Sequence, residues 1–158
     1  HVNSGIRNEI PRGLVDGPVG SSNFQVVPES GNWTELSDSV LSFSSLACVA
    51  QIHAAAQIFV QNTFIDANTS SKAPAIQIAI QIDGTVIPET ITGTTEPSQD
   101  QRTGAFAGAR TLPLVTTAVL PLSAGAHRIA IVVQSVGYRK NIPSWVGTNE
   151  LICLEMRT

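Results

Sequence analysis

The amino-acid sequence predicts an all-β protein folded as an antiparallel two-layer sandwich. The main observation is the run Ala75–Ile82, in which four isoleucines occupy alternate positions with alanine or glutamine between them. A period of two places the isoleucines on one face of an extended strand, and β-branched residues at this density disfavour a helix. Similar alternation recurs in about eight segments separated by turn residues, which favours a sandwich.

Length and composition indicate one domain that assembles with other proteins. The chain has 158 residues, of which 42% are hydrophobic and only 13% are charged. Soluble domains usually contain about 25% charged residues, so this surface must be built mainly from Ser, Thr, Asn and Gln and repels neighbours weakly. A net charge of −3 without a basic cluster argues against a nucleic-acid partner. No apolar run reaches membrane-spanning length, so we expect no membrane partner.

The first 22 residues are predicted to form an extended arm, and residues 23–158 the sandwich. Four glycines and two prolines exclude a regular helix from the arm, and its apolar residues show no period. Because such a segment cannot build a core, we expect its order to come from contacts outside the sandwich. The candidate partner-binding residues of the arm are Ile6, Arg7, Ile10, Arg12, Leu14 and Val15.

Strands are expected at residues 24–27 and 33–43, and a longer strand at 46–61. The even positions of the long strand are apolar and predict a core face. Its odd positions are too apolar for a freely solvated face, so this strand is either sandwiched inside the fold or buried at a subunit interface. The candidate interface residues on it are Val49, Gln51, His53 and Phe59.

The second half of the chain continues the alternating pattern. Asp83-Gly84 after the isoleucine strand is a dipeptide that favours a tight hairpin, with residues 85–87 leading back. The remaining segments are a long connection (92–110), two strands (112–122 and 127–134), a loop (136–148) and a last strand (151–157).

The last strand decides whether the two cysteines can pair. We expect its residues Ile152, Leu154 and Met156 to face the core, which would turn Cys153 to the opposite face from Cys48. A disulfide requires Cβ atoms within about 4.5 Å on one side of a sheet. The alternation therefore disfavours a bridge without excluding it.

Catalytic and metal-binding patterns are missing from the sequence. The three histidines lie on different predicted elements, and no phosphate loop, nucleophile elbow, CxxC or His-rich spacing occurs. We therefore expect neither an enzyme nor a bound cofactor or metal. His127 begins a strand and is expected to hydrogen-bond locally, whereas His53 is interpreted as an interface residue rather than a ligand.

Several motifs occur in order along the chain: Asn32–Leu36 leading to Ser39–Phe43, Ile82–Thr85, Leu120–His127 leading to Ile129–Ile131, and Glu150–Glu155. In these motifs and their order, residues 32–157 resemble the jelly-roll module of the tumour-necrosis-factor and complement-globular-head type. The chain is most similar to the versions found in tailed-phage virion proteins. The resemblance implies a homotrimer whose three-fold axis faces the sheet containing the long third strand and the last strand, which adds Cys153 to the candidate interface residues.

The same resemblance implies a structural role in a phage virion. The leading hypothesis is a trimeric capsid decoration (cement) protein on the head exterior, whose arm binds the major capsid protein or a neighbouring virion subunit. The alternative is a tail-fibre head or receptor-binding module, and a more distant one is a secreted cytokine-like ligand. For a fibre head, the candidate contact loop contains Tyr138, Arg139, Lys140 and Trp145.

Overall fold

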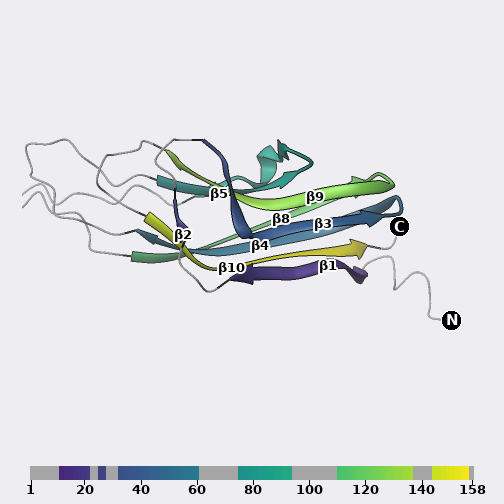
Figure 1. The fold of residues 1–158 in the computed structure, drawn as a ribbon, viewed down its shortest axis with the longest axis horizontal. Coiled ribbons are helices and arrows are strands. Elements are labelled where there is room, and N and C mark those ends of the chain that lie inside the picture. The colour runs from purple at the N-terminus through teal and green to yellow at the C-terminus, as the bar shows by residue number, and fades with distance from the viewer. Residues whose placement is uncertain are drawn as a thin grey trace, which may run out of the picture.

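The protein is built from two layers of antiparallel strands (Figure 1), as the alternation predicts. The computed structural model describes residues 11–21, 25–27, 32–60, 75–93, 110–136 and 144–156. Each layer is a five-stranded sheet. Across these ranges, no helix is long and apolar enough to span a membrane.

Most predicted strands appear within the described ranges, but β1 was not predicted and β10 begins seven residues before the predicted last strand. One short 3-10 helix follows the isoleucine hairpin. The bounds of these elements are β1 (Pro11–Ser21), β2 (Gln25–Val26), β3 (Thr34–Ser45), β4 (Cys48–Val60), β5 (Ala75–Ile82), β6 (Thr85–Val86), η1 (Pro88–Thr90), β7 (Thr92–Gly93), β8 (Arg110–Leu122), β9 (Gly125–Val136) and β10 (Ser144–Met156).

Two sheets divide these strands. The first, which we name the β10–β4 sheet, has the order β1-β10-β4-β8, with β2 paired to β10. The second, the β9–β5 sheet, has the order β3-β9-β5-β6, with β7 paired to β5. The long third strand of the sequence analysis, β4, is a direct neighbour of the last strand, β10, as expected.

The isoleucine strand β5 supplies the centre of the core. Ile76, Ile78 and Ile80 are fully buried, and Ile82 is 8% exposed. Asp83 and Gly84 both have positive φ, 50° and 83°, and form the predicted tight turn into β6. The sequence therefore predicted both the inward face of this strand and its hairpin correctly.

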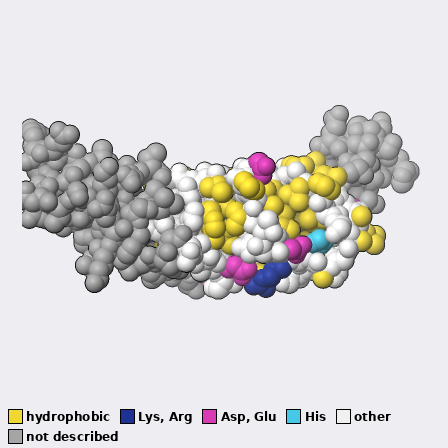
Figure 2. All heavy atoms as spheres, turned by 90° about the horizontal axis from the view of Figure 1, so that it is seen from above, with side chains coloured by type: hydrophobic (Ala, Val, Ile, Leu, Met, Phe, Trp, Pro, Cys, Tyr) yellow, Lys and Arg dark blue, Asp and Glu magenta, His cyan; other side chains and the backbone are white. Residues whose placement is uncertain are grey.

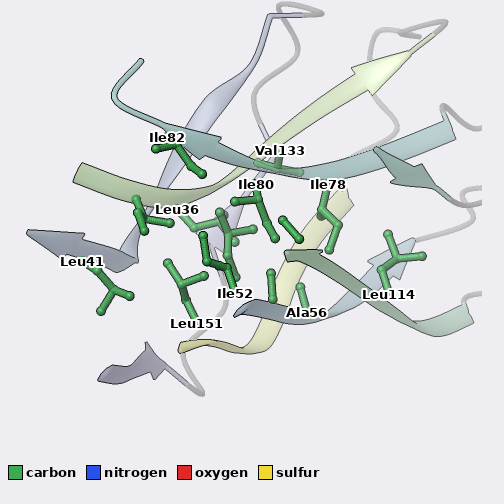
Figure 3. Close-up of a cluster of buried hydrophobic side chains, with 14 of the residues drawn as sticks. Leu36, Leu41, Ile52, Ala56, Ile78, Ile80, Ile82, Leu114, Val133 and Leu151 are labelled. Carbon is green, nitrogen blue, oxygen red and sulfur yellow. The ribbon is translucent and has the colours of Figure 1, made fainter. Parts of the chain in front are cut away.

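Figure 3 shows how the two layers meet. Isoleucines of β5 point toward side chains of β4 and β10, among them Ile52 and Leu151. Most of these side chains are β-branched or leucine and are less than 2% exposed. The main core is therefore an apolar layer between the sheets. Ala79, Ala130 and Val132 are also buried, on the other face of the β9–β5 sheet.

Strand β1 is the main departure from the expected architecture. Residues 11–21 pair antiparallel with β10 at the edge of the β10–β4 sheet. The expectation that the whole of 1–22 makes its contacts outside the sandwich is therefore wrong for this part, whereas Ile6, Arg7 and Ile10 lie outside the described residues. Arg12, Leu14 and Val15 belong to β1.

The glycines of β1 explain why its side-chain pattern gave no strand signal. A Cβ atom on Gly17 would lie 2.8 Å from the carbonyl oxygen of Leu151, and Gly17 has φ +96°. A glycine lets the backbone approach β10 closely at this point, where any larger residue would clash. The pairing also shifts register three times, so no simple period survives in the sequence.

Strand β10 faces the opposite way from the prediction. Leu151 and Cys153 are fully buried in the core, whereas Ile152, Leu154 and Met156 lie on the outer side of the sheet. Apolar residues occupy both parities of this segment, so alternation alone left its orientation ambiguous. A shift of the pairing register by one residue turns every side chain of a strand to the other face of the sheet. Here the register pairs Cys153 with the core residue Ile52, so Cys153 also faces the core.

Both cysteines are free. Cys153 and Cys48 lie on the core side, so the argument from opposite faces was wrong, but they are far apart along the sheet. Cys153 stands opposite Ile52, four positions from Cys48, which is roughly 13 Å at the rise of a strand. Burial raises the pKa of the Cys153 thiol to about 12, so it is a poor nucleophile.

Candidate functional site

The side of the β10–β4 sheet turned away from the core is the strongest candidate for a functional surface, and we call it the outer face. It is formed by the alternate residues of three neighbouring strands that do not point into the core. On β4 these are Val49, Gln51, His53, Ala55, Gln57 and Phe59; on β8, Val115, Thr117 and Val119; on β10, Trp145, Glu150, Ile152, Leu154 and Met156.

The outer face is unusually apolar for a surface. Val115 and Val119 are 65% and 60% exposed, and β8 has no charged residue from 111 to 122. Ile152 and Leu154 are half-buried on β10, on the other side of β4. Because antiparallel sheets that face water on one side usually alternate apolar and polar residues, this face is suited to contact with another protein surface.

His53 lies near the middle of the outer face. It stands opposite Ile152 of β10 on one side and Thr117 of β8 on the other. Its Nδ1 atom is 3.1 Å from the Thr117 hydroxyl oxygen, a hydrogen bond that orients the ring across the sheet. An imidazole surrounded largely by aliphatic side chains is a polar exception on this surface.

An aromatic pair closes one end of the face. The rings of Phe59 and Trp145 have centroids 5.6 Å apart and planes inclined by 47°. Trp145 was expected in a surface loop, but β10 already begins at Ser144, so this residue lies in a strand paired to β4. The other members of that candidate loop, Tyr138, Arg139 and Lys140, lie outside the described residues.

A shallow hollow of about 270 Å³ interrupts the outer face beside this pair. A β-bulge between Val146 and Asn149 spreads β10 locally, and the small side chain of Ala55 leaves the space unfilled. The wall is mostly apolar, with Glu150 at the rim. Its lining is Ala55, Ala56, Gln57, Pro113, Leu114, Val115, Thr148, Asn149 and Glu150.

The structure gathers most of the predicted interface residues on one surface. Val49, Gln51, His53 and Phe59 all belong to the outer face, and their role in an interface remains a prediction. Cys153 does not belong to it, because its side chain is fully buried between the sheets. The sequence analysis missed Val115 and Val119, although two valines at odd positions of the strand 112–122 already signalled a second apolar face.

A polar cluster, separate from the outer face, lies where the turn between β5 and β6 meets the turn between β8 and β9. His127 Nδ1 is 2.8 Å from Asp83 Oδ2, and its Nε2 is 2.7 Å from the carbonyl oxygen of Ser123. Both partners are hydrogen-bond acceptors, so this arrangement favours the protonated imidazole, in which both ring nitrogens donate. The predicted local hydrogen bond is the one to Ser123, while Asp83 is a distant partner that the sequence did not reveal.

The electrostatics of this cluster agree with its geometry. The Ser123 carbonyl, and then the Asp83 carboxylate, raise the pKa of His127. The backbone N–H of Arg128, 2.8 Å from Asp83 Oδ1, and then His127, lower the pKa of Asp83. Arg128 also donates to Glu35 at 2.6 Å. Figure 2 shows histidine, acidic and basic side chains side by side on this side of the molecule.

We expect the cluster to make stability depend on pH. The folded pKa of His127 is raised, so its contribution is complete below about pH 6.5 and is lost as pH rises through the folded value. The folded pKa of Asp83 is lowered, so its contribution is complete above about pH 4 and is lost as pH falls through the folded value. The stabilisation is therefore greatest at about pH 4–6.5.

Chemical denaturation of the Asp83→Asn variant across this range tests the expectation. In the wild type the free energy of unfolding should fall as the pH rises above about 6.5. In Asp83→Asn much of this fall should disappear, and the part that comes from the hydrogen bond between His127 and the Ser123 carbonyl should remain. The matched control is Glu35→Gln, which removes an exposed ion pair and should change the free energy of unfolding by less than about 1 kcal/mol at any pH. Identical pH profiles for Asp83→Asn and the wild type would contradict the assignment.

Among the described residues, no group of three or more His, Cys, Asp or Glu side chains is placed to hold a metal ion. The histidine of the polar cluster is occupied on both nitrogens by acceptors. What the outer face offers chemically is apolar contact area with one orientable imidazole.

Comparisons with known proteins address the architecture. No family model matches the chain, and no curated protein does. Among solved structures, the C-terminal domain of EclA, a sugar-binding protein, is 12% identical over 87% of this chain and 81% of that one, with a TM-score of 0.43. The carbohydrate-binding module CBM36, in complex with calcium and xylotriose, is 13% identical over 86% and 99%, with a TM-score of 0.36.

A viral structure is similar to the same degree. The structure of the infectious bursal disease virus Gt strain is 12% identical, covers 94% of this chain and has a TM-score of 0.37. This chain spans 34% of the viral chain. These likenesses concern the two-sheet antiparallel sandwich and do not bear on function.

Proposed function

We propose that this protein is a non-enzymatic structural subunit of a phage virion that assembles as a homotrimer through its outer face. The observation that carries the proposal is the apolar character of that face on a chain with few charges. Covering Val115, Val119, Ile152 and Leu154 removes apolar surface from water, which favours association by about 25 cal/mol per Å² buried. The resemblance to trimeric phage modules adds support from the sequence.

The shape of the outer face suits a cyclic assembly. In a closed ring of three, each subunit presents one patch to a different patch of its neighbour. The hollow beside Ala55 and the protruding Val119 lie at different positions on the face, so one subunit offers a recess and the next an apolar side chain. We infer that the neighbouring copy fills the hollow.

Filling the hollow from within should therefore weaken association. In Ala55→Leu the added side chain occupies space that the neighbour needs, and overpacking of this kind costs about 1–3 kcal/mol. We expect the association constant, measured by sedimentation equilibrium, to fall by about tenfold or more. The control is Ala126→Leu, an exposed alanine at the start of β9 in the other sheet. Equal association of both variants would show that the hollow lies outside the contact.

Attachment to the particle is assigned to residues before β1. Because Pro11–Ser21 pair with β10, Arg12, Leu14 and Val15 belong to the sandwich rather than to a separate tether. This leaves Ile6, Arg7 and Ile10 as the proposed contacts with the major capsid protein or a neighbouring subunit. Three such segments on one trimer would act together and raise the effective concentration for binding.

A cryo-electron-microscopy map of the phage particle that carries this chain tests the proposed role. We expect three copies around a local three-fold axis on the head exterior, with the β10–β4 sheets facing that axis. Location at the tip of a tail fibre would favour the receptor-binding alternative. Absence of the chain from purified particles would contradict a virion role altogether.

A further inference from the structure

We propose that His53 makes assembly through the outer face sensitive to pH, so that acidification weakens the contact between copies. This inference rests on the proposed self-association and adds a mode of regulation to the same surface. Histidine is the side chain whose ordinary titration falls between pH 5 and 8. A histidine enclosed between subunits therefore links their association to protons within that range.

The position of His53 makes its charge costly in an assembled state. It lies between Ile152 and Thr117 in the central part of the face, with Ala55 two positions along β4. The Thr117 hydroxyl can donate to or accept from Nδ1 of a neutral imidazole, so this nitrogen keeps its hydrogen bond inside a contact. A protonated ring would add a charge to an apolar interface in each subunit, which favours the separated copies.

The charged groups around His53 do not offset that cost. On β8, residues 111–122 carry no charge, and Arg110 pairs with Val60 at the far end of the strand. On β10, Glu155 lies opposite a core-facing alanine, on the other side of the sheet from His53. Asp16 of β1 lies opposite Cys153, also a core-facing position.

Among the residues that the structure describes, Glu150 is the acidic group that shares the outer face with His53. It stands opposite Ala55 rather than opposite His53, and it is exposed at the rim of the hollow. Solvent screens an exposed carboxylate strongly, so it compensates little for a charge enclosed by aliphatic side chains. We therefore expect protonation of His53 to weaken association rather than strengthen it.

Sedimentation equilibrium of the full chain at about pH 7.5 and pH 5.5 tests the proposal. We expect the wild-type association constant to fall by about tenfold or more on acidification, as one proton's linkage over this range allows. His53→Gln retains a hydrogen-bonding group toward Thr117 and should associate equally at both values. His53→Phe provides a second neutral side chain should the glutamine variant prove unstable.

Two further variants separate His53 from other titrating groups. Asp83→Asn alters the polar cluster on the opposite sheet, and Glu150→Gln removes the acid of the outer face; both should keep the wild-type pH dependence. Loss of the dependence in either variant, or its persistence in His53→Gln and His53→Phe, would overturn the assignment to His53. Association that is equal at both pH values in the wild type would overturn the inference alone, whereas no association at either value would overturn the proposed function with it.

Discussion

Replacing Val119 with aspartate is expected to convert the proposed homotrimer into monomers. Val119 is 60% exposed in the single chain, so the substitution places the carboxylate in solvent and should not disturb folding. In the trimer the same carboxylate would be enclosed by apolar side chains of the outer face and its neighbour. The loss of hydration costs several kcal/mol for each buried ion, and three copies incur it together.

The matched control for this variant is Leu46→Asp. Leu46 is 85% exposed in the turn between β3 and β4, away from the outer face, although the sequence analysis had expected it to face the core. The Leu46→Asp variant introduces the same charge in place of an exposed aliphatic side chain. It should leave the mass of the assembly, measured by light scattering, unchanged. If Val119→Asp stayed assembled, or if Leu46→Asp dissociated to the same extent, the outer face would not be the contact.

Truncating Ile80 to alanine should produce the largest loss of stability. Ile80 is fully buried in β5, opposite Ile131 of β9, and points toward the other sheet. Deleting the side chain removes buried apolar surface and leaves a cavity, which costs about 2–5 kcal/mol of unfolding free energy for such residues. Urea denaturation with an unchanged slope would measure the loss.

The neighbouring residue provides the control for this truncation. Gln81 lies on the opposite face of β5 and is half-buried, and Gln81→Ala should change the unfolding free energy by no more than about 0.5 kcal/mol. A larger loss for Gln81→Ala than for Ile80→Ala would mean that β5 presents its other face to the core.

The fold was predictable wherever one of the two alternating sets of residues in a strand was clearly more apolar than the other. In β5 the isoleucines alternate with alanine and glutamine, so only one orientation buries them. The Asp83-Gly84 turn was equally clear, because both residues adopt the positive φ that this dipeptide favours. The two-layer architecture followed from the repetition of such segments.

Strands whose pairing depends on the rest of the molecule could not be predicted in the same way. The last strand is apolar on both parities, and only its bulged register with β4 decides that Leu151 faces inward. Strand β1 depends on glycines that allow its backbone to approach β10 closely. The periodicity of side chains along the sequence does not reveal such a backbone contact. Both cases require long-range pairing before the local pattern has a meaning.

The candidate site was predicted in part for the same reason. The odd positions of β4 indicated an interface because they are too apolar for a freely solvated face, while the even positions already form the core face. That β8 lies beside β4 and extends the surface with Val115 and Val119 is a property of sheet order, which the sequence does not state. The Asp83–His127 pair likewise joins two turns that are 44 positions apart in the chain.

The mass of the wild-type protein in solution tests the central claim most directly. The chain has a mass of 16.7 kDa, so a homotrimer assembled through the outer face has a mass of about 50 kDa, three times that value. Sedimentation equilibrium at neutral pH, over micromolar concentrations, should fit this single mass. A mass of 16.7 kDa across the whole concentration range would contradict assembly through the outer face.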